Sequence, residues 1–469
     1  MEKLTFHSSE LLPMHPVVSS AEYRQRRDRL MAKLGQGTAI FASAPQAVMH
    51  NDVEYVFRQD SDFFYLTGFN EPEAIAVFAP HHEEHQFILF VQPKDPAKET
   101  WTGIRYGVEG VQSSFGADIA YPIGELDEHL PKYLEKADKI YYHLGRDEAL
   151  NQTILKHWQK QLAAYPRQGY GPQALVNSHG LVHPLRQVKS ETELALLRRA
   201  CDLSAIAHQR AMEFARPGHY EYQVQAELEI IFRREGGLGP AYPSIVAAGK
   251  NACILHYINN DCPLLDGDLL LIDAGCAYGY YNGDITRTFP INGKFSPEQR
   301  TLYEIVLTAQ EAAIAKVQAG NPYHEYHDAA VSVIVDGLMD LGLLVGNKEE
   351  IIKEEKYKPF YMHRTGHWLG LDVHDAGNYK QDKDTWTVLE PGQVLTVEPG
   401  IYIAPDIKPA EGQPEVPEQW RGIGIRIEDD VLVTAQGPDV LTSAVPHADV
   451  LGHRAQGDRR LRTLIGQTL

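Results

Sequence analysis

The chain has 469 residues, of which 43% are hydrophobic and 23% charged, as in soluble globular proteins of two or three domains. Its formal net charge of −19 at pH 7 argues against a surface that binds nucleic acid. No secretory signal begins the sequence, no apolar run approaches the ~20 residues of a membrane span, and the four cysteines form no CxxC pair. We therefore expect a reduced, cytoplasmic protein without nucleic-acid or membrane partners.

The first part of the chain has the pattern of a compact α/β domain. A helix is expected from Ala21 to Gly35, and a loop at 99–107 should carry Trp101 and Arg105, where a tryptophan most often packs but can also bind. Short β-rich runs and a helix at 148–163 complete this domain. The expected strands are 38–43, 62–69, 74–80, 86–93 and 141–145.

The segment 177–190 lacks periodicity and contains glycine and proline, so we place a domain boundary there, with domains at 1–182 and 183–469. Ser190 and Glu193 form a capping box that predicts a helix start. Further helices and strands alternate to residue 434. The expected helices are roughly 221–235, 296–318, 325–341 and a terminal one within 452–469, and the expected strands are 241–257, 268–291, 394–403 and 422–434.

Three carboxylates in this second domain follow strongly apolar runs, Asp273, Glu398 and Glu428, and a fourth, Asp284, lies eleven residues after Asp273, past a turn of Gly, Tyr and Asn. An ionised carboxylate at the end of a buried strand is costly unless it is paired or binds a metal. For any one of them a hydrogen-bonded core acid or a turn residue is the commoner explanation. Four of them in one stretch favour a shared site.

The segment 363–377 contains three histidines, His363, His367 and His374, among small residues. Such a cluster is either a polar surface loop or a place where imidazoles converge on a metal or substrate. The four carboxylates favour the second interpretation.

Carboxylates together with one imidazole form a hard ligand set, which suits Mn²⁺, Co²⁺ or Fe²⁺ at least as well as Zn²⁺. Two such cations ~3.5–4 Å apart would share a water and polarise a carbonyl or phosphoryl oxygen. Arg426 lies two residues before Glu428 on the same strand face, where it either orients a ligand or forms an ordinary salt bridge.

Five motifs in order, LIDAG, GDITRTF, GHWLGLDVHD, TVEPGIY and IRIED, resemble those of the pita-bread metallopeptidases, in particular the Xaa-Pro aminopeptidase (aminopeptidase P) and prolidase branch. The stretch FRQDSDFFYLTGFNEPEA (57–74) is similar to the accessory domain of aminopeptidase P, so the resemblance covers essentially the whole chain. It implies an α+β protein, in which a C-terminal pita-bread catalytic domain follows an N-terminal α/β accessory domain.

The resemblance also implies roles for individual residues. His256 and His363 resemble residues that line the pocket for the proline side of the scissile bond, and His374 the one that hydrogen-bonds the substrate carbonyl. Glu398 resembles a ligand that also shuttles protons. The metal ligands implied are Asp273, Asp284, His367, Glu398 and Glu428.

Tyr242 and Tyr402 are expected in the substrate pocket on the same basis, with Arg426 beside the catalytic groups. Trp101 and Arg105 correspond to a loop that, in tetrameric relatives, leans over the active site of a neighbouring subunit. A homodimer or homotetramer is therefore implied.

We expect a dinuclear-metal exopeptidase that releases the first residue of peptides with proline second, by attack of a metal-bridging water or hydroxide. The two ions would be Mn²⁺ first, with Co²⁺, Fe²⁺ or Zn²⁺ as alternatives. A prolidase, which cleaves Xaa-Pro dipeptides at the same kind of site, is the main alternative, and a pita-bread protein that only binds partners is a remote one.

Overall fold

The computed structural model describes residues 17–448, so the helix expected within 452–469 lies outside the described residues. The described residues divide into two compact units, one of which is Val17–Arg186 and the other of which begins at Gln187. Each is described separately below. Within the described range no helix is both long and apolar enough to cross a membrane. All four cysteines are free thiols.

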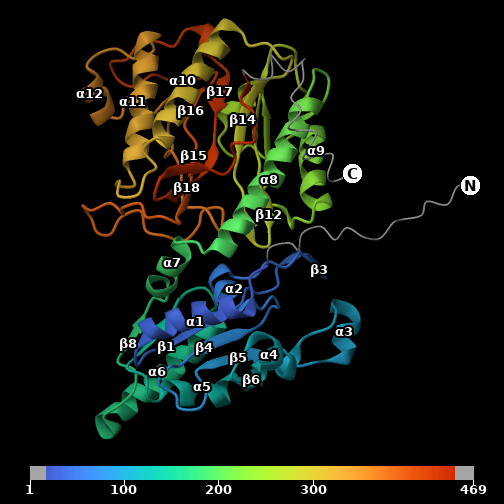
Figure 1. Cartoon of the computed structure of the whole chain (residues 1–469), viewed down its shortest axis with the longest axis vertical. Helices are drawn as coiled ribbons and strands as arrows, with labels where there is room; N and C mark the ends of the chain where they lie inside the picture. The colour runs from blue at the N-terminus through green and yellow to red at the C-terminus, as the bar shows by residue number, and fades with distance from the viewer. Residues whose placement is uncertain (1–16, 449–469) are drawn as a thin grey trace, which may run out of the picture. The chain divides into compact units, whose positions relative to one another are not determined.

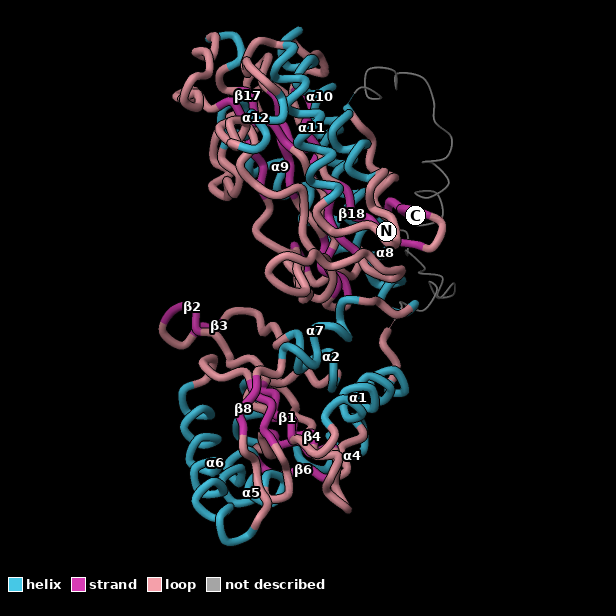
Figure 2. Tube along the Cα trace, turned by 90° about the vertical axis from the view of Figure 1, so that its left-hand side faces the viewer, coloured by secondary structure: helices cyan, strands magenta, loops and turns pink. Residues whose placement is uncertain are grey.

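The first unit is built on a six-stranded mixed sheet with the strand order β6-β5-β4-β1-β7-β8. Helices α5 and α6 pack on one face of this sheet and α1 on the other (Figure 2). The sheet strands are β1 (Thr38–Ala42), β4 (Ile75–Phe78), β5 (Phe87–Val91), β6 (Ile119–Pro122), β7 (Lys139–Tyr142) and β8 (Ala174–Val176), and β2 (Val48–His50) and β3 (Val53–Glu54) form a separate hairpin. The helices are α1 (Ser20–Leu34), α2 (Ser61–Thr67), α3 (Pro96–Thr102), α4 (Gly107–Phe115), α5 (Leu126–Leu134), α6 (Glu148–Gln168) and α7 (His179–Gln187).

The run 62–69, expected as a strand, is instead the helix α2, so that prediction is wrong. The Asp60 side chain caps its first turn by accepting the N–H of Phe63 at 2.8 Å, and Gly68, with φ of 67°, ends it in the left-handed region. These two caps outweigh the preference of a Phe-Phe-Tyr run for a strand. Likewise Trp101, expected on a loop, lies in the last turn of α3.

In the second unit, strands lie between two helix pairs, α8–α9 and α10–α11 (Figure 1). The capping box predicted at Ser190 is present and begins α8. The helices are α8 (Glu191–Phe214), α9 (Glu221–Arg234), α10 (Pro297–Ile314), α11 (Glu325–Asp340) and α12 (Lys348–Lys353).

The strands of this unit form several small antiparallel sheets, ordered β10-β11-β14, β13-β12-β9, β15-β18-β19 and β16-β17. Of the expected strand 241–257 only β10 is extended, so His256 lies in a loop. The strands are β9 (Gly239–Pro240), β10 (Ile245–Ala248), β11 (Leu269–Asp273), β12 (Cys276–Tyr278), β13 (Tyr281–Asn282), β14 (Thr286–Pro290), β15 (Val394–Val397), β16 (Gly400–Ile403), β17 (Ile423–Arg426), β18 (Asp429–Thr434) and β19 (Gly437–Val440).

Candidate metal centre

The four predicted carboxylates come from the ends of neighbouring strands. Asp273 is the last residue of β11 and pairs with Thr286 in β14, two residues after Asp284. Glu428 joins β17 to β18, and its N–H donates to the Thr286 carbonyl at 3.0 Å. Glu398 joins β15 to β16. Short antiparallel strands that end together therefore bring acids 155 positions apart in the sequence to one place.

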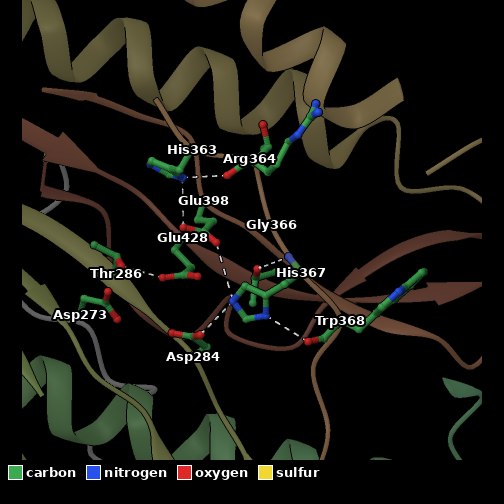
Figure 3. A network of polar contacts seen from close by, with 12 residues as sticks. Asp273, Asp284, Thr286, His363, Arg364, Gly366, His367, Trp368, Glu398 and Glu428 are labelled. Carbon is green, nitrogen blue, oxygen red and sulfur yellow. Dashed lines mark hydrogen bonds and ion pairs between the residues drawn. The ribbon is translucent and has the colours of Figure 1, made fainter. Parts of the chain in front are cut away.

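His367 completes the group. Its backbone N–H donates to Thr396 Oγ1 at 3.1 Å, and its ring Nδ1 lies 3.0 Å from the Trp368 carbonyl. An Nδ1–H donated to that carbonyl leaves the Nε2 lone pair free, and Nε2 lies 3.4 Å from Asp284 Oδ2 and 3.7 Å from Glu398 Oε1. Figure 3 shows this imidazole facing the four carboxylates.

The spacing of these atoms fits metal ligation. Ligand atoms of Asp284, His367 and Glu428 lie within 4.8 Å of one another. Asp273, Asp284 and Glu428 are buried, and Glu398 is half-buried. The structure thus brings together all five residues expected to be ligands.

Arg426 supplies the positive charge in direct contact with this set. Its guanidinium donates to Asp273 Oδ2 at 2.5 Å, to Thr286 Oγ1 at 3.0 Å and to the Tyr402 hydroxyl at 3.0 Å. One guanidinium offsets one of four carboxylates, so three negative charges remain for bound cations to balance.

The pKa values reflect this excess of negative charge. Burial, with repulsion from the neighbouring acids, raises the pKa of Glu428, and burial raises the pKa of Asp273. Burial likewise raises the pKa of Glu398 to about 7. Burial alone would lower the pKa of His367, but Asp284 and Glu398 raise it to about 9. The metal-free site thus retains protons that bound cations would displace, as a metal site does.

Two tyrosines expected in the substrate pocket have other contacts. The Tyr242 hydroxyl donates to Asp273 Oδ1 at 2.6 Å and to Asp284 Oδ1. Tyr402 is buried, and its hydroxyl lies 2.8 Å from His363 Nε2. Neither tyrosine lines the cavity described below. Their contacts fit residues that orient others rather than residues that touch a substrate.

A relay of hydrogen bonds orients His363. Arg426 donates to the Tyr402 oxygen, so the Tyr402 O–H is available to donate to His363 Nε2. His363 Nδ1–H then donates to the Arg364 carbonyl at 2.7 Å. Burial and the Arg426 charge lower the pKa of His363 to about 3, which keeps the ring neutral.

A cavity of about 600 Å³ opens onto the carboxylates. Of the residues predicted for the site, it is lined by His256, Asp273, His363, His367, His374, Glu398 and Arg426. The His374 ring lies 4.2 Å from that of His367. The cavity therefore joins the predicted histidines to the carboxylate cluster.

Several lining residues were not predicted. They come from the start of α11 and the two residues before it, from the segment after α12 and from the loop 377–388: Tyr323, His324, Tyr326, His327, Arg364, Tyr379, Lys380 and Trp386. Except for Arg364, which lies within the histidine-rich segment 363–377, their sequence context gave no signal, because a lone aromatic or basic side chain is common on any surface. Trp101 belongs to the other unit, where its side chain is 88% exposed.

Comparisons with known proteins agree with this geometry. Residues 195–435 match metallopeptidase family M24, and residues 23–141 match the N-terminal domain of aminopeptidase P. The chain is 44% identical to the Xaa-Pro aminopeptidase of Escherichia coli K12, over 91% of this chain and 96% of that protein. It is 36% identical to the Xaa-Pro aminopeptidase 3 of Mus musculus, over 92% of this chain and 85% of that protein. The solved structure of Pseudomonas aeruginosa aminopeptidase PepP matches with 48% identity and a TM-score of 0.87, covering 93% of this chain and 98% of that one.

Proposed function

The chain belongs to metallopeptidase family M24, with an aminopeptidase P N-terminal domain, and we propose that it removes the first residue from peptides whose second residue is proline. Membership confirms the predicted pita-bread fold and the predicted resemblance. The relatives named Xaa-Pro aminopeptidase support the substrate class.

One observation supports the proposal most strongly: four carboxylates and one imidazole converge at strand ends with one guanidinium among them. We propose Asp273, Asp284, His367, Glu398 and Glu428 as ligands of two divalent cations. The hard donor set favours Mn²⁺, while a zinc-substituted structure of E. coli aminopeptidase P shows that a relative also accepts Zn²⁺. Bound cations would polarise the scissile carbonyl and make a shared water more acidic.

The protein's own groups position the peptide and move the proton. Glu398, which lines the cavity with its Oε1 3.7 Å from His367 Nε2, is proposed to accept the proton of the attacking water and pass it to the leaving nitrogen. His374, at the cavity wall beside His367, is proposed to donate to the substrate carbonyl oxygen as charge develops there.

His256 and His363 are proposed to hold the proline ring. Both line the cavity, and the relay through Tyr402 keeps His363 neutral and fixed in orientation. An Xaa–Pro bond is a tertiary amide with restricted geometry, so a preformed pocket favours it. We propose that a carboxylate oxygen of the ligand set accepts a hydrogen bond from the free amino terminus, which would restrict cleavage to the first residue.

Prolidase activity is the second candidate. Arg364 and Lys380 line the same cavity, and either cation could bind the free carboxylate of an Xaa-Pro dipeptide. We also propose a cytoplasmic location, supported by the four free thiols, and a homo-oligomer of two or four chains.

The two activities separate in a paired turnover assay with added Mn²⁺. An Xaa-Pro-Pro tripeptide should lose its first residue, an Xaa-Ala-Pro control should be cleaved poorly, and an Xaa-Pro dipeptide should be a poor substrate. Activity confined to the dipeptide would make the protein a prolidase. No hydrolysis of any of them by metal-loaded protein would refute both proposals.

A further inference from the structure

A cluster of histidines in the first unit has no part in the chemistry above. Helix α7 carries His179 and His183, which are one turn apart and therefore on the same face. Their rings stack with centroids 4.1 Å apart. Both face Asp62 in the first turn of α2, and all three residues belong to the unit 17–186.

The distances between these side chains match those between metal ligands. Asp62 Oδ2 lies 3.4 Å from His183 Nε2 and 4.0 Å from His179 Nε2, and one ligand atom from each residue lies within 4.8 Å of the others. Ligand atoms about 2.0–2.1 Å from a tetrahedral zinc ion are about 3.4 Å apart. A small side-chain adjustment would bring all three within bonding distance of one ion.

The carboxylate of Asp62 is also held in place from its other side. Arg186 bonds the other oxygen, Oδ1, at 2.6 Å, as Arg426 does for Asp273 in the catalytic unit.

A second observation points to a ligand. The ring of His143, in the loop after β7, lies 4.0 Å from that of His179. Within the described part of the chain its buried Nδ1 has no hydrogen-bond partner, so this nitrogen is available as a further donor. The side chains of His179 and His183 are 30% and 25% exposed, so an ion can reach them from solvent and keep a water ligand.

We propose that Asp62, His179 and His183 form a metal site in the first unit for one divalent cation of borderline softness, such as Zn²⁺. A set of two imidazoles and one carboxylate binds Zn²⁺ better than it binds harder cations such as Mg²⁺ or Ca²⁺. The ion would tie α7, the last helix of this unit, to α2. The site would stabilise the unit and take no part in peptide hydrolysis.

The test is the number of zinc ions bound per chain, measured by elemental analysis after dialysis of the full-length protein at fixed free Zn²⁺. His179→Ala and His183→Ala should each bind one ion fewer than the wild type, with unchanged peptide turnover. His50→Ala, which removes an exposed histidine of the same unit, should bind as many ions as the wild type. Equal zinc content in all four proteins would overturn the proposal, and this difference does not depend on how many ions the catalytic centre holds.

A second measurement needs no variant, should either alanine variant fail to fold. Carbethoxylation of wild-type histidines, followed by mass spectrometry of the peptides, reports the accessibility of each ring nitrogen. Zinc should slow the modification of His179 and His183 and leave His50 unchanged. Equal rates with and without zinc would also overturn the proposal.

Discussion

The change Arg426→Gln tests the electrostatic account of the site most sharply. It removes the guanidinium that touches the carboxylate cluster, together with its bonds to Asp273, Thr286 and Tyr402. Glutamine keeps a planar amide donor but loses the charge. Arg426→Lys is the matched control, because it keeps the charge and loses the planar fork.

The expected magnitude follows from those contacts. Breaking a buried ion pair costs about 3–5 kcal/mol, because the partner carboxylate stays buried without its counter-ion. Bound cations offset part of this, so we take the lower end, about 3 kcal/mol, which corresponds to a fall of about 150-fold in kcat/KM. The kcat/KM of the lysine variant should fall by less than this. The metal-free protein should lose less stability than this, since the pKa of Asp273 is already raised and its carboxyl can take up a proton.

The assay is kcat/KM on an Xaa-Pro-Pro peptide at several Mn²⁺ concentrations, with bound manganese measured in parallel. The glutamine variant should need more Mn²⁺ for half-maximal activity, and the lysine variant should lie between it and the wild type. A glutamine variant that keeps more than a third of wild-type kcat/KM, with normal metal affinity, would refute the electrostatic reasoning.

Three further changes probe the same site. Tyr402→Phe breaks the relay to His363 and should reduce kcat/KM about tenfold, whereas Tyr142→Phe, which removes a buried hydroxyl that bonds Asn151 in the first unit, should leave it unchanged. Folding raises the pKa of Glu398 from 4.5 to about 7, so the metal-free protein binds this proton more tightly than the unfolded chain does and loses stability as pH rises through 7. Urea unfolding in the presence of a chelator measures the free energy of unfolding at pH 4.5 and at pH 8. The decrease in this free energy between the two pH values should be roughly 3 kcal/mol smaller for Glu398→Gln than for the wild type, and equal decreases would contradict this. Gly366→Ala would place a Cβ 1.9 Å from the Thr396 carbonyl oxygen, so its thermal midpoint should fall by about 5 °C, and an unchanged midpoint would argue against this close approach.

Local sequence signals predicted much of the fold. The capping box at Ser190 and the proline after Ser296 marked true helix starts, because caps act within a single turn. The run 62–69 was predicted wrongly as a strand because its aromatic residues favour strands, although the Asp60 and Gly68 caps that outweigh this preference are local signals too.

The candidate site was predictable where an acid follows an apolar strand, since a buried charge requires a partner. The contacts of the two tyrosines were not predictable. Tyr242 bonds acids 31 and 42 positions away, and Tyr402 bonds a histidine 39 positions away. Such contacts depend on how strands pair across the sheet rather than on neighbouring residues. The residues of the loop 377–388 that line the cavity could not be predicted for the same reason.

The central claim is that the five clustered residues hold the cations on which peptide cleavage depends. The most direct measurement is turnover of an Xaa-Pro-Pro peptide by metal-depleted protein as Mn²⁺ is added, for the wild type and for His367→Ala, with bound manganese determined at each point. The account predicts no turnover under chelation, recovery in the wild type as the site fills, and no recovery in the folded variant. Near-normal kcat in the chelated wild type, or in His367→Ala, would contradict it.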